Sequence, residues 1–61
     1  MNKQVIEKVS KYLTLRNVKH YTDELEVIVI VNELHLTLSQ GECVNLAIVQ
    51  TESELEYLNT L

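Results

Sequence analysis

Residues 24–38, ELEVIVIVNELHLTL, constrain the fold of this chain more than any other stretch. Five consecutive β-branched residues occupy positions 27–31, and leucines then occupy every second position from Leu34 to Leu38. β-Branched side chains favour strands, and strict alternation places one set of residues on one face of a sheet. The stretch therefore predicts two strands joined at Asn32 and Glu33.

A two-residue turn at Asn32 and Glu33 would set the register of this hairpin. The facing pairs would be Val31 with Leu34, Val29 with Leu36, and Val27 with Leu38. All of these side chains would then point to one side, as a buried sheet face requires. Glu33 is less suited to such a turn than glycine, because it adopts positive φ less readily.

Residues 39–50, SQGECVNLAIVQ, allow two interpretations. In the first, Gly41 ends a three-residue loop and Cys43–Val49 forms a third strand. In the second, Ser39 and Glu42 form a capping box that opens a helix running to the C-terminus. The strand is preferred, because the run is short, rich in strand-forming residues and followed at once by a second helix-start signal.

Two segments carry helical patterns. The first would be capped by Asn2 and ended by Asn17 in the left-handed conformation, with Val18 folding back on the last turn. Its apolar stripe consists of Val5, Ile6, Val9, Tyr12 and Leu13. The second would begin at a T-x-x-E box, Thr51 to Glu54, with a stripe of Leu55, Leu58 and Leu61. Residues 18–24 are either a loop or contain a short extended piece at Val18–Tyr21.

The predicted fold is one small α+β domain over residues 1–61, with an N-terminal helix, a three-stranded antiparallel β-meander and a short C-terminal helix. The alternative is a helix, a β-hairpin and a long C-terminal helix. A chain of 61 residues is near the lower limit for a single core. Cys43 is the only cysteine, which excludes an internal disulfide, and its spacing from His20 and His35 predicts no metal or other cofactor. Self-association is the remaining source of stability, so a homodimer is expected.

The second face of the predicted sheet is too apolar to remain in water. The predicted protein interface on this face consists of Ile28, Ile30, His35, Ala47 and Val49. The other possibilities are that one of the helices crosses to cover it, or that the segment Cys43–Val49 is helical and the face is smaller. His35 and Cys43 would share the face, but no orienting group or oxyanion loop accompanies this imidazole and thiol, so no catalytic residue is predicted.

Charge divides the chain into a basic beginning and an acidic remainder. All five basic residues lie in the first twenty positions, and eight acids follow from residue 21 onward. An acidic partner-binding surface is predicted at Glu24, Glu26, Glu52 and Glu56, with ordinary solubility as the alternative explanation. Lys3, Lys8 and Lys11 are the candidate nucleic-acid contacts, although three lysines without an interleaved aromatic residue bind phosphate weakly.

These features favour binding over catalysis. The longest apolar run, Val27–Val31, is far too short to span a membrane, and a single thiol without an export signal suits a cytoplasmic protein. We expect a small acidic protein-binding module that is not an enzyme. It would be a homodimeric inhibitor or adaptor of the kind encoded by phages and mobile elements, which acts by steric occlusion of a partner protein. The alternative is a small dimeric DNA-binding transcriptional regulator that uses the basic N-terminal helix.

Overall fold

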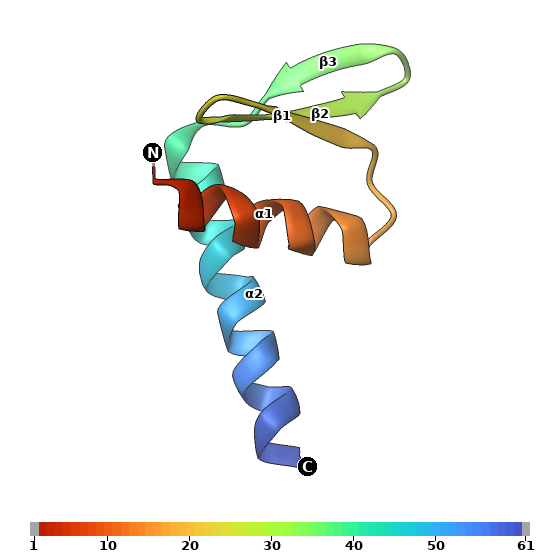
Figure 1. Cartoon of the computed structure of the whole chain (residues 1–61). Helices are drawn as coiled ribbons and strands as arrows, with labels where there is room; N and C mark the ends of the chain where they lie inside the picture. The colour runs from red at the N-terminus through yellow and green to blue at the C-terminus, as the bar shows by residue number, and fades with distance from the viewer. Residues whose placement is uncertain (1, 61) are drawn as a thin grey trace.

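The computed structural model describes residues 2–60, which fold into helices at both ends of the chain with a sheet between them. In chain order the elements are α1 (Lys3–Leu15), β1 (His20–Asp23), β2 (Glu26–Val31), β3 (Leu34–Thr37) and α2 (Gln40–Thr60). The strands form one antiparallel sheet in the order β1-β2-β3. The sheet lies over α1, and α2 crosses α1 and continues away from the sheet (Figure 1). The predicted α+β class and the order helix, three-stranded antiparallel sheet, helix are confirmed.

The ends of α1 are fixed by two asparagines, as predicted. The Asn2 side-chain oxygen accepts hydrogen bonds from the backbone N–H groups of Gln4 and Val5, at 2.6 and 3.2 Å. At the other end Asn17 has φ of 58°, and the Val18 N–H donates to the Leu13 carbonyl at 3.0 Å. This left-handed residue ends the helix and turns the chain back toward the sheet.

The β2–β3 hairpin has the predicted register. Val31 pairs with Leu34 and Val29 with Leu36, and the Leu38 N–H donates to the Val27 carbonyl at 2.9 Å. The turn uses Asn32 and Glu33 at φ of 49° and 71°, so both residues take the left-handed conformation that a two-residue hairpin requires.

Cys43–Val49 is helical, so the prediction of a third strand there is wrong. The Glu42 N–H donates to Ser39 Oγ, and the Ser39 N–H donates to Glu42 Oε1, both at 3.2 Å. This reciprocal capping box satisfies two N–H groups at the start of α2 and outweighs the strand propensity of the following run. Thr51 starts no new helix, because its hydroxyl donates to the Ala47 carbonyl within α2 at 3.0 Å. The predicted short helix from Thr51 is therefore the second half of α2, and Leu61 lies outside the described residues.

The third strand is β1. It lies in residues 18–24, for which the sequence allows either a loop or a short extended piece. His20 pairs with Val29 and Thr22 with Val27. His20 and Thr22 therefore lie on the same sheet face as these valines, which is the face toward α1. The strand is polar, and only two of its residues face the helix.

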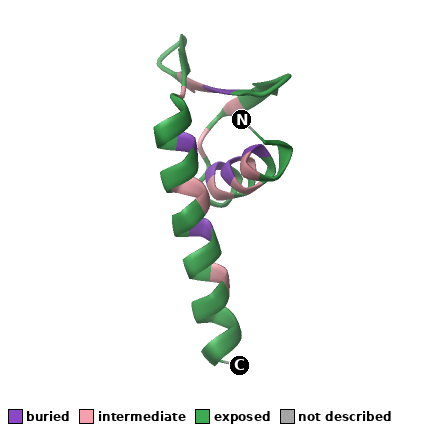
Figure 2. Cartoon of the chain, turned by 90° about the vertical axis from the view of Figure 1, so that its left-hand side faces the viewer, coloured by how far each residue is buried: buried purple, intermediate pink, exposed green. Residues whose placement is uncertain are grey.

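The core lies around α1, which contacts the sheet on one side and α2 on the other (Figure 2). It consists of Ile6, Val9 and Leu13 of α1, Val27 of β2 and Cys43 of α2. α2 packs mainly on α1 and not on the sheet. Among residues 2–60 no helix combines the length and apolar character that crossing a membrane requires.

Candidate interaction surfaces

The outer face of the sheet, which points away from α1, carries Ile28, Ile30 and His35 of the predicted interface. Tyr21 of β1 and His35 of β3 meet across β2, with ring centroids 5.7 Å apart and the Tyr21 hydroxyl 3.0 Å from His35 Nδ1. Strands on either side of a central strand are about 9.6 Å apart, so both rings must lean inward over β2. Ile28 is only 6% exposed and Ile30 is half-buried. The chain itself therefore covers much of the surface expected to need a partner.

Ala47 and Val49 do not share that face, because the segment that holds them is helical. Ala47 packs against the core, while Val49 is 40% exposed on α2. Cys43 is fully buried, so it lies in the core and His35 lies on the outer sheet face. The expectation that the thiol and the imidazole share one face is wrong for the same reason.

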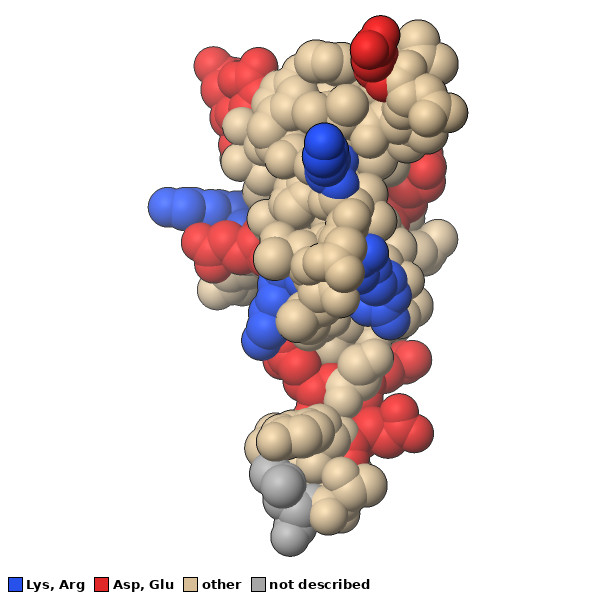
Figure 3. All heavy atoms as spheres, turned by 90° about the vertical axis from the view of Figure 1, so that its right-hand side faces the viewer, with Lys and Arg blue, Asp and Glu red and all other residues tan. Residues whose placement is uncertain are grey.

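The predicted acidic surface divides into two clusters. Glu24 and Glu26 are exposed at the β1–β2 turn, while Glu52 and Glu56 are exposed on α2. The turn lies above α1 and this part of α2 lies below it in Figure 1. Figure 3 shows basic side chains across the middle of one face, with acidic side chains toward both ends. A single partner surface would have to span the molecule to contact both clusters.

Two of the three lysines predicted to contact nucleic acid are held in an ion-pair cluster. Glu54 of α2 accepts from Lys8 Nζ at 2.6 Å and from Lys11 Nζ at 3.0 Å. The buried Gln50 side chain also donates to Glu54, at 3.1 Å. The hydrogen bond from Lys8, followed by those from Gln50 and Lys11, lowers the pKa of Glu54 to about 2. This cluster joins α1 to α2, and the single negative charge of Glu54 offsets one of the two positive charges of the lysines.

Lys3 is the remaining lysine of that set, and it is exposed at the start of α1. The role of Glu54 had no sequence signal beyond its negative charge. Only the crossing of the two helices brings it to Lys8 and Lys11, which precede it by 46 and 43 residues.

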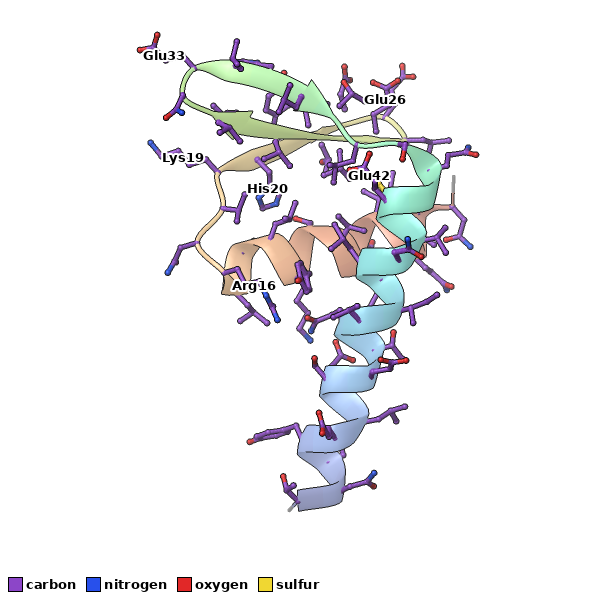
Figure 4. All side chains as sticks on the ribbon, turned by 180° about the vertical axis from the view of Figure 1, so that it is seen from behind. Arg16, Lys19, His20, Glu26, Glu33 and Glu42 are labelled. Atoms are coloured by element: carbon purple, nitrogen blue, oxygen red, sulfur yellow. The ribbon has the colours of Figure 1, made fainter. Side chains whose placement is uncertain are left out.

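A serine and a histidine meet between α1 and β1, which the sequence alone did not suggest. Ser10 Oγ lies 2.9 Å from His20 Nε2, and His20 Nδ1 lies 2.9 Å from the Val18 carbonyl oxygen. Figure 4 shows His20 directed from the sheet toward α1. Ser10 lies in the middle of α1, where backbone N–H groups donate within the helix and cannot form an oxyanion hole. The arrangement therefore fixes β1 to α1, and it lacks the donors that acyl transfer needs.

Much apolar surface remains uncovered. Besides separate exposed side chains such as Leu15 and Leu25, it includes three regions. The sheet overhang consists of Val31, Leu34 and Leu36, which are 44%, 63% and 50% exposed on the inner side of the sheet. The α1–α2 groove has a volume of about 380 Å³, and its apolar lining is Val5, Val44, Ala47 and Ile48. The α2 tail is residues 55–60, which expose Leu55, Tyr57 and Leu58. Tyr57 and Leu58 line an open hollow together with Leu15 and Arg16 of α1.

The total accessible surface also indicates that this chain leaves more of its surface uncovered than a compact monomer does. The chain exposes 4681 Å², whereas a compact monomer of 7.1 kDa exposes about 4,100 Å². The excess of about 600 Å² is comparable to the roughly 800 Å² that each partner buries in a standard protein–protein interface. Charge is also absent from much of this surface, because Glu42 is the only charged residue between Leu34 and Thr51.

Comparisons with protein-family models, curated protein sequences and solved structures found no match for this chain. Within residues 2–60 no group of three or more His, Cys, Asp or Glu side chains is arranged to hold a metal ion.

Proposed function

We propose that the chain is a homodimeric protein-binding module, an inhibitor or adaptor that covers the binding surface of a partner protein and performs no catalysis. The observation that carries this proposal is the α2 tail. Its large apolar side chains, Leu55, Tyr57 and Leu58, are 56%, 65% and 62% exposed. Apolar side chains that are more than half exposed contribute little to the stability of their own chain, so their exposure favours a role in binding.

The partner surface can be described by its chemistry. Leu55 and Leu58 are three residues apart and therefore lie side by side on α2. Glu52 precedes Leu55 by three residues on the same helix and is also exposed. An apolar groove with a basic rim would suit this surface, in the manner of other helix-in-groove complexes. Binding would occlude that groove, and a reducing cytoplasm would suit the single buried thiol.

The charge pattern favours a protein partner over DNA. Lys8 and Lys11 are paired with Glu54, and the chain carries a net charge of −4. A duplex would be repelled by the acidic remainder and would find few free cations. Fluorescence anisotropy with random duplex at low salt should show no binding at tens of micromolar. Saturable binding at those concentrations would favour the DNA-binding regulator instead.

The test of the α2 tail compares two leucine variants in affinity capture from the native cell. Leu58→Lys should reduce capture of the specific partner by at least about tenfold, because a lysine would enter an apolar groove beside basic groups. Leu25→Lys is the matched control, since Leu25 is 50% exposed at the opposite end of the molecule. The purified partner should then bind the wild-type chain and the control alike, and more weakly as salt rises. Equal capture by all three proteins would refute the proposal.

A further inference from the structure

β3 is an edge strand with free backbone groups on one side. The sheet order β1-β2-β3 gives β3 a single neighbouring strand. The Leu38 N–H donates to Val27, and backbone direction alternates along a strand, so Leu34 and Leu36 also direct their N–H and C=O groups toward β2. His35 and Thr37 therefore direct theirs to the open edge. All four residues of β3 are exposed.

Features that prevent edge pairing are few on this strand. Natural edge strands are commonly blocked by lysine, proline, a bulge or a covering element. β3 is short, but its sequence LHLT contains neither a charged residue nor proline, and it packs on β2 and not on the body of α1. The inner side of the strand is also apolar, since Leu34 and Leu36 belong to the sheet overhang.

The charge pattern favours a second copy of this chain as the occupant. Two copies, each with a net charge of −4, repel one another over most of their surfaces. A two-fold axis places each residue near its own counterpart, so a self-contact must avoid like charges. From Leu34 to Gly41 the chain has no charged residue, and this stretch contains the whole of β3. Two uncharged β3 edges can pair without electrostatic repulsion. A positively charged partner would find no opposite charge on this edge to attract it.

We propose that β3 pairs antiparallel with β3 of a second copy, with the two Leu36 residues facing each other at the two-fold axis, to form a continuous six-stranded sheet. This inference rests on the proposed homodimer and specifies its interface. In this register His35 and Thr37 of one copy exchange backbone hydrogen bonds with Thr37 and His35 of the other. The register makes four such bonds, two on each side of the axis. Leu36 meets Leu36 on the inner face, and Leu34 comes opposite Leu38.

In this dimer both α2 tails would remain exposed and able to bind a partner protein. The tails begin beyond Glu54, whereas β3 lies on the other side of α1 (Figure 1). One assembly can therefore combine self-association at the sheet edge with partner binding at the α2 tail. The two functions can be disrupted separately, which makes the two proposals independently testable.

The first experiment measures mass by light scattering for Leu36→Lys and Leu25→Lys at the same concentration. Both leucines are 50% exposed, so neither substitution should unfold the chain, and circular dichroism verifies this. Leu36→Lys should raise the dimer dissociation constant by at least about 100-fold, because two ammonium groups would meet at the axis. Leu25→Lys should remain a dimer. A dimeric Leu36→Lys would refute pairing through β3 while leaving the homodimer in place.

The second experiment traps the register by a disulfide in a Cys43→Ala background. Facing residues that are not hydrogen-bonded to each other have Cα atoms about 4.5 Å apart, which suits a disulfide. Leu36→Cys should therefore form a covalent dimer with diamide, which accepts the two hydrogens released as the S–S bond forms. Leu25→Cys should remain monomeric on a non-reducing gel. Failure of Leu36→Cys to cross-link in a protein that is dimeric by mass would refute this register, and a monomeric wild-type chain would overturn the dimer together with its interface.

Discussion

Replacing Glu33 by glycine should stabilise the fold, because Glu33 occupies the left-handed region at φ of 71°. That conformation costs a residue with a side chain about 1–2 kcal/mol. Glycine removes this cost but loses about 0.5–1 kcal/mol more backbone entropy on folding. The net gain should be about 0.5–1 kcal/mol, which corresponds to a rise in melting temperature of about 2–8 °C for a domain of this size.

Urea and thermal unfolding followed by circular dichroism at one fixed protein concentration would measure this gain. Glu33→Gln is the matched control, since it removes the same charge while keeping the strained conformation, and it should change stability by less than about 0.5 kcal/mol. Asn32→Gly tests the same turn at a residue that tolerates positive φ, and its effect should be near zero. The reasoning would be refuted if Glu33→Gly had no effect, or if Glu33→Gln stabilised the chain equally.

Three further predictions concern the core and the contact between the helices. Val9→Ala should destabilise the chain by about 2–3 kcal/mol in urea unfolding, because Val9 is fully buried and its loss leaves a cavity; a change below about 1 kcal/mol would contradict the described core. The Cys43 thiol should react slowly with a disulfide reagent until urea is added, since burial, and secondarily Glu42, raises its pKa; rapid reaction in the native state would contradict this. The pKa of Glu54 is lowered from 4.5 to about 2, so its stabilising contribution is complete above pH 4.5 and declines as the pH falls toward 2. Unfolding of wild type and Glu54→Gln across this range should show a stability difference that shrinks with acid, and a constant difference would argue against the ion-pair cluster.

The β2–β3 hairpin could be predicted because its information is local. Alternation from Val27 to Leu38 determines which residues share a face, and a two-residue turn leaves one register that keeps them together. The ends of α1 could be predicted for the same reason, since Asn2 and Asn17 act on backbone groups within a few residues of themselves.

The third strand could not be recognised from alternation. Cys43–Val49 has the composition of a strand, but the capping box at its start makes it helical. The strand that completes the sheet, His20–Asp23, has no apolar alternation because its inward residues, His20 and Thr22, are polar. His20 bonds to Ser10 of α1, which replaces the apolar contact that a sequence pattern would show.

The interaction surfaces depend on how the three strands and the two helices pack together. Alternation predicts that Ile28 and Ile30 lie on the face opposite the valines, but Tyr21 and His35 cover them only because β1 flanks β2. The sheet overhang consists of residues that had been assigned to the core. They are exposed because α2 packs on α1 and leaves β3 uncovered, which no local pattern could reveal.

Sedimentation equilibrium of the wild-type chain from about 5 to 500 μM tests the central claim most directly. The claim is that the exposed apolar surface of this small domain exists for association. It predicts a mass that rises with concentration and levels off at twice 7.1 kDa, as expected for a closed two-fold dimer. A mass that remains at 7.1 kDa over the whole range would contradict it.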